Sequence, residues 1–184
     1  MELPLAIALS CAAYFLEGGG YIVTGTFLPA IVEGLPGLGG LGTDAWILVG
    51  LAAAPSTVLW AKAASRAGPD AALVAAYAVQ AVGIFLLVVS TAWWAATMSA
   101  MLFGGTFVGI SALTLTYTQR VVGPRRVGLA IGLLTAAFGV GQVLGPLVAA
   151  SLVGDTSDFR PALVVASAAV TLGACCCRSW GLLG

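Results

Sequence analysis

The chain has 184 residues, of which 60% are hydrophobic and only 8% charged, and its mean hydropathy is +1.08. A soluble globular domain has roughly 45–50% apolar and about 25% charged residues, and a disordered chain has low hydrophobicity, so both classes are excluded. Seven basic and seven acidic residues give a net charge of zero, which indicates no nucleic-acid partner. This composition predicts an all-α membrane protein in a lipid bilayer, because each bilayer crossing needs about 20 mostly apolar residues.

The residues that support most enzymatic and metal chemistry are missing or badly placed. The chain has no histidine, which excludes histidine-based triads and HExxH zinc sites. Three of the four cysteines, Cys175, Cys176 and Cys177, are consecutive. On a helix their side chains would point about 100° apart, which does not suit a tetrahedral metal site. We therefore expect no enzyme activity, no metal and no cofactor.

Six apolar runs follow one another, separated by short loops that are rich in glycine, proline or charge. The predicted membrane helices span residues 3–32, 46–64, 71–90, 93–117, 127–153 and 161–177. The first run is longer than the core of a signal peptide. Thr43-Asp44, ahead of the second run, is typical of a helix N-cap. Residues 1–184 are thus predicted to form a single six-helix transmembrane domain.

Lysine and arginine are distributed unevenly between the two sides of this domain. Arg160 lies on one side, and the other six lie on the side that holds both termini. These six are Lys62, Arg66, Arg120, Arg125, Arg126 and Arg178. Because basic loops stay in the cytoplasm, the sequence predicts a multi-pass protein of the inner (plasma) membrane with both termini cytoplasmic. The preference for arginine, with abundant alanine and glycine, is typical of a GC-rich bacterial source.

The six runs form two triplets of opposite topology, a 3+3 inverted repeat, in which runs one and four hold matching positions. Glycines interrupt both runs at mid-depth: Gly18-Gly19-Gly20 in the first, and Gly104, Gly105 and Gly109 in the fourth. Glycine-interrupted helices in matching places indicate the binding site of a transporter. Close helix packing through small residues is the alternative, and the two interpretations are compatible.

Glu17 is the one ionisable residue near the middle of a predicted membrane run. It belongs to a polar stripe spaced at i, i+3, i+7 and i+10, made of Tyr14, Glu17, Tyr21 and Thr24. A carboxyl at this depth is costly unless it faces the protein interior or a water-filled cavity. We therefore interpret the stripe as a substrate or proton site, with the tyrosine hydroxyls bonding the carboxyl. The alternative is a neutral glutamic acid that is hydrogen-bonded to a neighbouring helix.

Three further polar residues lie at mid-depth in other runs. Thr106, beside the glycines of the fourth run, is a candidate for the same cavity as Glu17, although a bond to its own helix is the commoner role for threonine. Gln80 and Gln142 are mid-membrane amides in runs three and five. For both, hydrogen bonding between helices is favoured over substrate contact.

The fifth run carries a more specific pattern, G-x8-G-x3-G-P-x2-A-A. It is made of Gly132, Gly141, Gly145, Pro146, Ala149 and Ala150. Gly141 and Gly145 are one turn apart and let a second helix approach closely, whereas Pro146 removes a backbone hydrogen bond. The pattern resembles the glycine/proline motif on the fifth helix of major facilitator superfamily (MFS) antiporters. This resemblance implies a packing and gating helix in a six-helix MFS bundle.

The loop between the second and third runs resembles the corresponding loop of MFS transporters. MFS chains carry G-x3-D-R-x-G-R-R there, and Arg66 and Gly68 match it. Ser65 stands in place of the acid, and Pro69 and Asp70 stand in place of the two basic residues. Such replacement is typical of the second half of MFS transporters.

Three longer stretches resemble the YbfB/YjiJ-like branch of MFS transporters: residues 14–29, 102–110 and 130–146. In that branch they would belong to helices seven, ten and eleven, in the C-terminal half. The resemblance implies an MFS-type half bundle that moves a small-molecule solute by alternating access. Glu17 would be its proton or substrate site, and we expect the transport to be coupled to protons. It also implies a second six-helix half, as a separate chain or a self-dimer. The alternative is a truncated, non-transporting fragment or a structural membrane subunit.

The predicted topology can be tested with single cysteines in a background whose four native cysteines are replaced. An impermeant thiol reagent added from the outer face should modify Asp155→Cys and leave Arg125→Cys unmodified, because the basic loop stays inside. The reverse labelling pattern would overturn the orientation.

Overall fold

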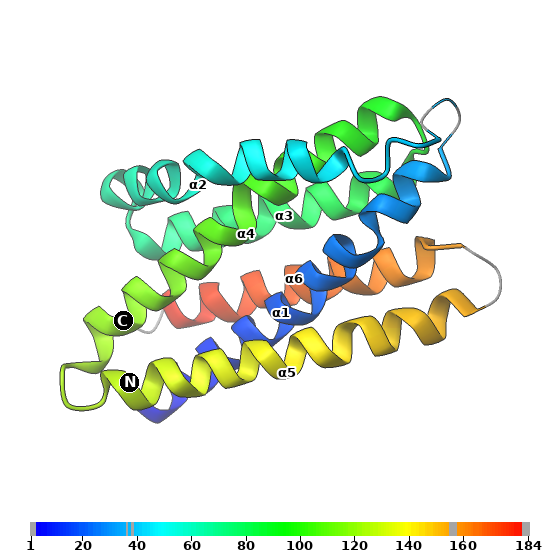
Figure 1. Cartoon of the computed structure of the whole chain (residues 1–184). Coiled ribbons are helices and arrows are strands. Elements are labelled where there is room, and N and C mark those ends of the chain that lie inside the picture. The colour runs from blue at the N-terminus through cyan, green and yellow to red at the C-terminus, as the bar shows by residue number, and fades with distance from the viewer. Residues whose placement is uncertain (1–2, 36, 38, 155–157, 182–184) are drawn as a thin grey trace.

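The structure is a computed structural model that describes residues 3–35, 37, 39–154 and 158–181. Over these residues the chain forms six helices, without strands, and each helix is long and apolar enough to cross a membrane. In chain order they are α1 (Leu3–Glu33), α2 (Ala45–Ala67), α3 (Pro69–Val89), α4 (Trp93–Val122), α5 (Val127–Val153) and α6 (Arg160–Gly181) (Figure 1). The predicted class, an all-α six-helix membrane protein, is confirmed.

Several helices are longer than their apolar runs. The prediction ended the second and fourth helices at residues 64 and 117, whereas α2 continues to Ala67 and α4 to Val122. Both end at a glycine with positive φ, Gly68 at 89° and Gly123 at 68°, and in each case a proline comes next. The length of an apolar run reflects the thickness of the bilayer. The helix itself continues until the backbone leaves the helical conformation, here at a glycine.

The N-cap predicted for the second helix is correct in position and wrong in chemistry. Asp44 directly precedes α2, but its side chain makes no capping hydrogen bond. Its backbone is in the right-handed helical region rather than the extended conformation that a capping side chain requires. Asp44 therefore marks the start of α2 without capping it.

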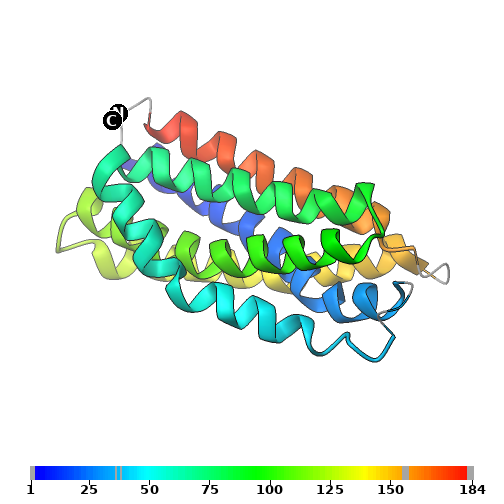
Figure 2. The ribbon, with the colours of Figure 1, turned by 90° about the horizontal axis from the view of Figure 1, so that it is seen from above.

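The helix packing repeats when α1 is exchanged with α4, α2 with α5, and α3 with α6. The most extensive contacts are those of α1 with α5 and, in exchange, of α4 with α2. The contacts of α1 with α6 likewise match those of α4 with α3, and the α3–α6 pair maps onto itself. α2 and α5 lie at opposite margins of the bundle and are its least buried helices (Figures 1 and 2). This arrangement is the one that a 3+3 inverted repeat predicts.

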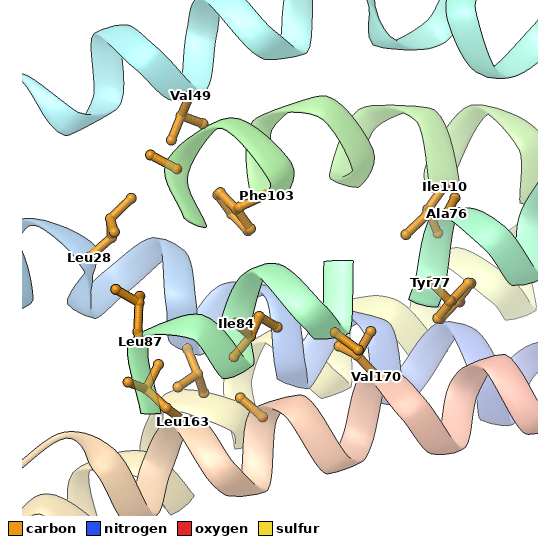
Figure 3. Close-up of a cluster of buried hydrophobic side chains, with 14 of the residues drawn as sticks. Leu28, Val49, Ala76, Tyr77, Ile84, Leu87, Phe103, Ile110, Leu163 and Val170 are labelled. Atoms are coloured by element: carbon orange, nitrogen blue, oxygen red, sulfur yellow. The ribbon is translucent and has the colours of Figure 1, made fainter. Parts of the chain in front are cut away.

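The hydrophobic core lies where α3 meets α6 and α4. Ile84 and Leu87 of α3 contact the region of Leu163 and Val170 of α6 (Figure 3). All four side chains are buried, and Phe103 of α4 continues the same cluster. The start of α1 and the end of α6 lie at the same end of the bundle (Figure 2). The core thus holds the two triplets together and leaves α2 and α5 as flanks.

The prediction that glycines interrupt two of the helices is wrong, because α1 and α4 are each continuous through them. The glycines instead allow close packing. A Cβ atom placed on Gly18 would collide with the backbone carbonyl of Phe138 on α5, and one on Gly20 would lie 2.8 Å from the Ala166 carbonyl on α6. On α5, a Cβ on Gly145 would lie 2.5 Å from the Gly19 carbonyl. Backbone therefore meets backbone between α1 and α5.

The equivalent α2–α4 interface uses glycines in the same way. A Cβ on Gly104 would lie 2.8 Å from the Cα atom of Val49, and one on Gly109 would collide with the Trp60 ring. The Trp60 indole Nε1 donates a hydrogen bond of 2.7 Å to the Gly105 carbonyl. The tryptophan therefore fills the groove that the glycines leave on α4.

We expect Gly145→Leu to destabilise the fold, because its side chain would force α5 away from the Gly19 backbone. Overpacking of this kind costs about 1–3 kcal/mol. At about 2–4 °C per kcal/mol for a chain of this size, the melting temperature in detergent should fall by several degrees.

Gly132→Leu is the matched control from the same motif. Gly132 is exposed, and a Cβ there meets no atom within 4 Å. Leucine also favours a helix more than glycine does, by about 1 kcal/mol, so this variant should melt at or slightly above the native temperature. Equal melting temperatures for the two variants would contradict the packing role of Gly145.

Candidate functional site

Glu17 lies inside the bundle, and its side chain is 1% exposed. It occupies the middle of α1, one residue before the glycines that pack against α5 and α6. Its carboxyl is directed at α3, where Gln80 Nε2 donates a hydrogen bond of 2.7 Å to Oε1. Glu17 is therefore sealed from water in this conformation and faces the protein interior, one of the two environments in which a membrane carboxyl is tolerated.

The hydrogen bond continues beyond Gln80 to α4. The Thr106 hydroxyl donates to Gln80 Oε1 at 2.9 Å, and Gln80 and Thr106 are 0% and 1% exposed. Glu17, Gln80 and Thr106 thus form a buried polar chain that links α1, α3 and α4. Glu17 and Thr106 were predicted to share a site, and the structure brings them together through the amide between them.

The carboxyl of Glu17 is poorly compensated as an anion. Its Oε2 atom has no hydrogen-bond partner, and no basic side chain of the described residues pairs with it. Burying a charge with one hydrogen bond and no counter-ion costs several kcal/mol even after relaxation of the surroundings. An apolar side chain would fill this space without that cost, so Glu17 is a candidate for function rather than for stability.

The tyrosines of the predicted stripe point away from the carboxyl. Tyr21 stacks on Phe107 of α4 and Phe138 of α5, with ring centroids 5.6 Å and 5.5 Å apart. Its hydroxyl accepts a hydrogen bond of 2.8 Å from Gln142 Nε2. Tyr14 stacks on the same Phe138 at 4.4 Å. The prediction that tyrosine hydroxyls bond the carboxyl is wrong, because both residues lie on the side of α1 that faces α4 and α5.

Thr24, the last residue of the stripe, is 0% exposed, and its hydroxyl has no hydrogen-bond partner. The stripe therefore divides into an aromatic part, an acidic part and an isolated hydroxyl. Residues that share a spacing on one helix can still meet different neighbours, since α1 packs against α5 and α6, contacts α4 and is bonded to α3.

The predicted motif residues also separate by location. Gly141 and Gly145 pack against α1, whereas Gly132 faces open space and Pro146 is half-buried. In the loop motif, Gly68 joins α2 to α3 with a φ of 89°, and Arg66 is exposed in the last turn of α2. None of these six residues contacts Glu17 through a hydrogen bond. Gly141 and Gly145 hold α5 close to α1, the helix that carries Glu17.

Gln80 is the residue whose importance the sequence understated. The sequence favours bonding between helices for both mid-membrane amides, and the bonds of Gln80 and Gln142 are of that kind. What the sequence leaves open is the partner. The signal was present, because Gln80 is the one amide in α3, a helix that is otherwise apolar except for Asp70 and Tyr77.

A bundle of six apolar helices, each long enough to cross a membrane, defines a multi-pass membrane protein. Comparison with family models gives the same answer from the sequence. The model described as "Uncharacterised MFS-type transporter YbfB" matches residues 2–178, so the chain belongs to that family of MFS-type transporters. A search of curated proteins gives no match. The family is one of transporters, which move solutes without covalent chemistry.

The bond between Tyr21 and Gln142 can be measured with a double-mutant cycle. Tyr21→Phe and Gln142→Met should each destabilise the chain, and together they should cost less than their sum. The expected coupling energy is about 0.5–1.5 kcal/mol, from unfolding in mixed micelles. Tyr21→Phe paired with Gln119→Met is the control, because Gln119 is exposed. Equal coupling in the two cycles would refute the bond.

Proposed function

We propose that the chain is half of an MFS-type secondary transporter that moves a small solute by alternating access, coupled to protons through Glu17. Membership of an MFS-type transporter family supports transport and does not favour a fragment or a structural subunit. One observation carries the proton coupling: a carboxyl that is 1% exposed within a membrane helix and has no cationic partner among the described residues.

The coupling follows from the energetics of that carboxyl. Inside the closed bundle the charged form of the carboxyl is costly, so burial favours uptake of a proton by Glu17. Opening of the bundle to water on one side would hydrate Glu17 and allow the proton to leave. A carrier that exposes Glu17 alternately to the two sides would thus tie solute movement to proton movement.

A second six-helix half is part of this proposal, as a separate chain or as a second copy of this one. Six helices pack here around a filled core rather than around a pathway. A pathway would therefore form between two halves, with α1 and α4 as its walls on this side. The location proposed is the inner (plasma) membrane, with both termini cytoplasmic, on the evidence of the lysine and arginine distribution.

The test is Glu17→Gln in the native assembly purified from its host membrane. Gln keeps the shape of the side chain and a carbonyl that can accept the Gln80 hydrogen bond, but it does not titrate. Proteoliposomes loaded with a pH-sensitive dye are screened with a panel of small organic solutes to find one that drives proton movement. With that solute the variant should fold normally, lose proton movement, and retain solute counterflow.

Glu33→Gln is the matched control. Glu33 is exposed at the end of the same helix, so its loss should leave proton movement at the native level. Full proton movement in Glu17→Gln would end the coupling hypothesis. Failure of Glu17→Gln to fold would instead assign Glu17 a structural role.

A further inference from the structure

The Thr106 hydroxyl has more acceptors within reach than it has protons. It lies 2.9 Å from Gln80 Oε1, 2.7 Å from the Leu102 carbonyl and 3.1 Å from the Phe103 carbonyl. One hydroxyl proton forms one of these bonds at a time. The hydroxyl can therefore donate either to Gln80 or to its own helix, and in the second case its oxygen is free to accept a bond.

With Glu17 ionised, the donors and acceptors that link Glu17, Gln80 and Thr106 match in one direction. Gln80 Nε2 donates to the carboxylate, and Thr106 donates to Gln80 Oε1. All three side chains are at most 1% exposed, so water does not substitute for a missing partner. The bonds run from α4 through α3 to α1.

With Glu17 protonated on Oε1, the carboxyl O–H and the Gln80 Nε2–H would both be donors. In the same geometry they would face each other without an acceptor between them. The amide oxygen and nitrogen of glutamine are nearly equal in size, so rotation of the amide by about 180° fits the same space. After rotation, the Glu17 hydroxyl donates to Gln80 Oε1, and Gln80 Nε2 donates to Thr106. The Thr106 hydroxyl then donates to the Leu102 carbonyl, 2.7 Å away.

We propose that Gln80 is a positioning residue for Glu17, whose side-chain amide turns over when the carboxyl gains or loses its proton and thereby reverses the hydrogen bond to Thr106 on α4. The inference rests on the proposed function, in that it takes Glu17 as the coupling carboxyl. It adds a route by which the protonation state of α1 reaches α4, the matching helix of the other triplet. In this chain of bonds, Gln80 on α3 lies between the side chains of α1 and α4.

The other titratable groups around Glu17 do not supply an alternative trigger near neutral pH. They are Tyr14 and Tyr21 on α1, Tyr77 on α3 and Cys177 on α6. Phenols and thiols ordinarily lose their protons only at a pH of about 10 and about 8.5, so neither is charged at pH 7. The Tyr77 hydroxyl is moreover held by the Ala13 carbonyl at 3.2 Å. Glu17 is thus the group whose charge changes in this part of the bundle.

Infrared difference spectroscopy of the full chain in liposomes tests the proposal without any solute. Gln80, Gln119 and Gln142 are the only glutamines, so Gln119→Met with Gln142→Met leaves one glutamine to label at its side-chain carbonyl by cell-free synthesis. Between alkaline and acidic buffer, the Gln80 carbonyl band should move to lower wavenumber, since a carboxylic acid is a stronger donor than a hydroxyl. Glu17→Met should abolish the shift.

Two substitutions at Thr106 separate the switch from simple packing. Thr106→Val keeps the shape but removes the acceptor that the rotated amide needs, which leaves a buried N–H without a partner, so the band shift should be lost. Thr106→Ser restores a hydroxyl and should restore the shift. Both variants leave Gln80 and Glu17 in place.

The outcomes distinguish this inference from the proposed function. A Glu17 carboxylic acid band that appears at acidic pH while the Gln80 band stays fixed would overturn the switch and leave proton coupling intact. Absence of any Glu17 band across the pH range would overturn both. A Gln80 shift together with full proton movement in Glu17→Gln would support the switch and overturn the coupling.

Discussion

The fold depends on the close approach of α1 to α5, where backbone meets backbone at Gly18, Gly19, Gly141 and Gly145. In a bilayer, apolar side chains gain little from leaving lipid for protein, so van der Waals contact between helices replaces the hydrophobic effect as the cause of association. Glycine gives the largest contact because it brings two backbones together. The same solution recurs between α2 and α4, where Trp60 occupies the space that Gly109 leaves. The two triplets of helices thus match in their packing as well as in their topology.

The glycine contacts also determine the place of the acid. With one side of α1 held against α5 and α6, Glu17 is directed toward α3. There an amide meets it, and a threonine of α4 meets the amide. A polar chain of this kind is costly when any member lacks a partner, and Glu17 Oε2 does lack one. An ionised carboxyl in this position is therefore costly to bury.

Comparison of the sequence predictions with the structure separates two kinds of inference. Those based on hydropathy, above all the six helices, are confirmed within a few residues at the helix ends. Those based on one-helix periodicity are less reliable. The stripe from Tyr14 to Thr24 has the right spacing, yet its members meet α3, α4 and α5 separately. The glycines in α1 and α4 suggested breaks, and they proved to be contact surfaces of continuous helices.

The sequence by itself determined that this is a membrane protein with six apolar helices. It also contains the family motif, and Glu17 as the single acid near the middle of a predicted membrane run. These follow from composition and from spacing along one helix, because the bilayer requires long apolar segments with internally bonded backbone. The tertiary structure alone decided which residues bond that acid. Gln80 and Thr106 lie 63 and 89 positions from Glu17 along the chain (80 − 17 and 106 − 17), and their contact depends on the rotation of three helices about their axes. Those rotations are set by glycine contacts between helices, which no single segment of the sequence contains.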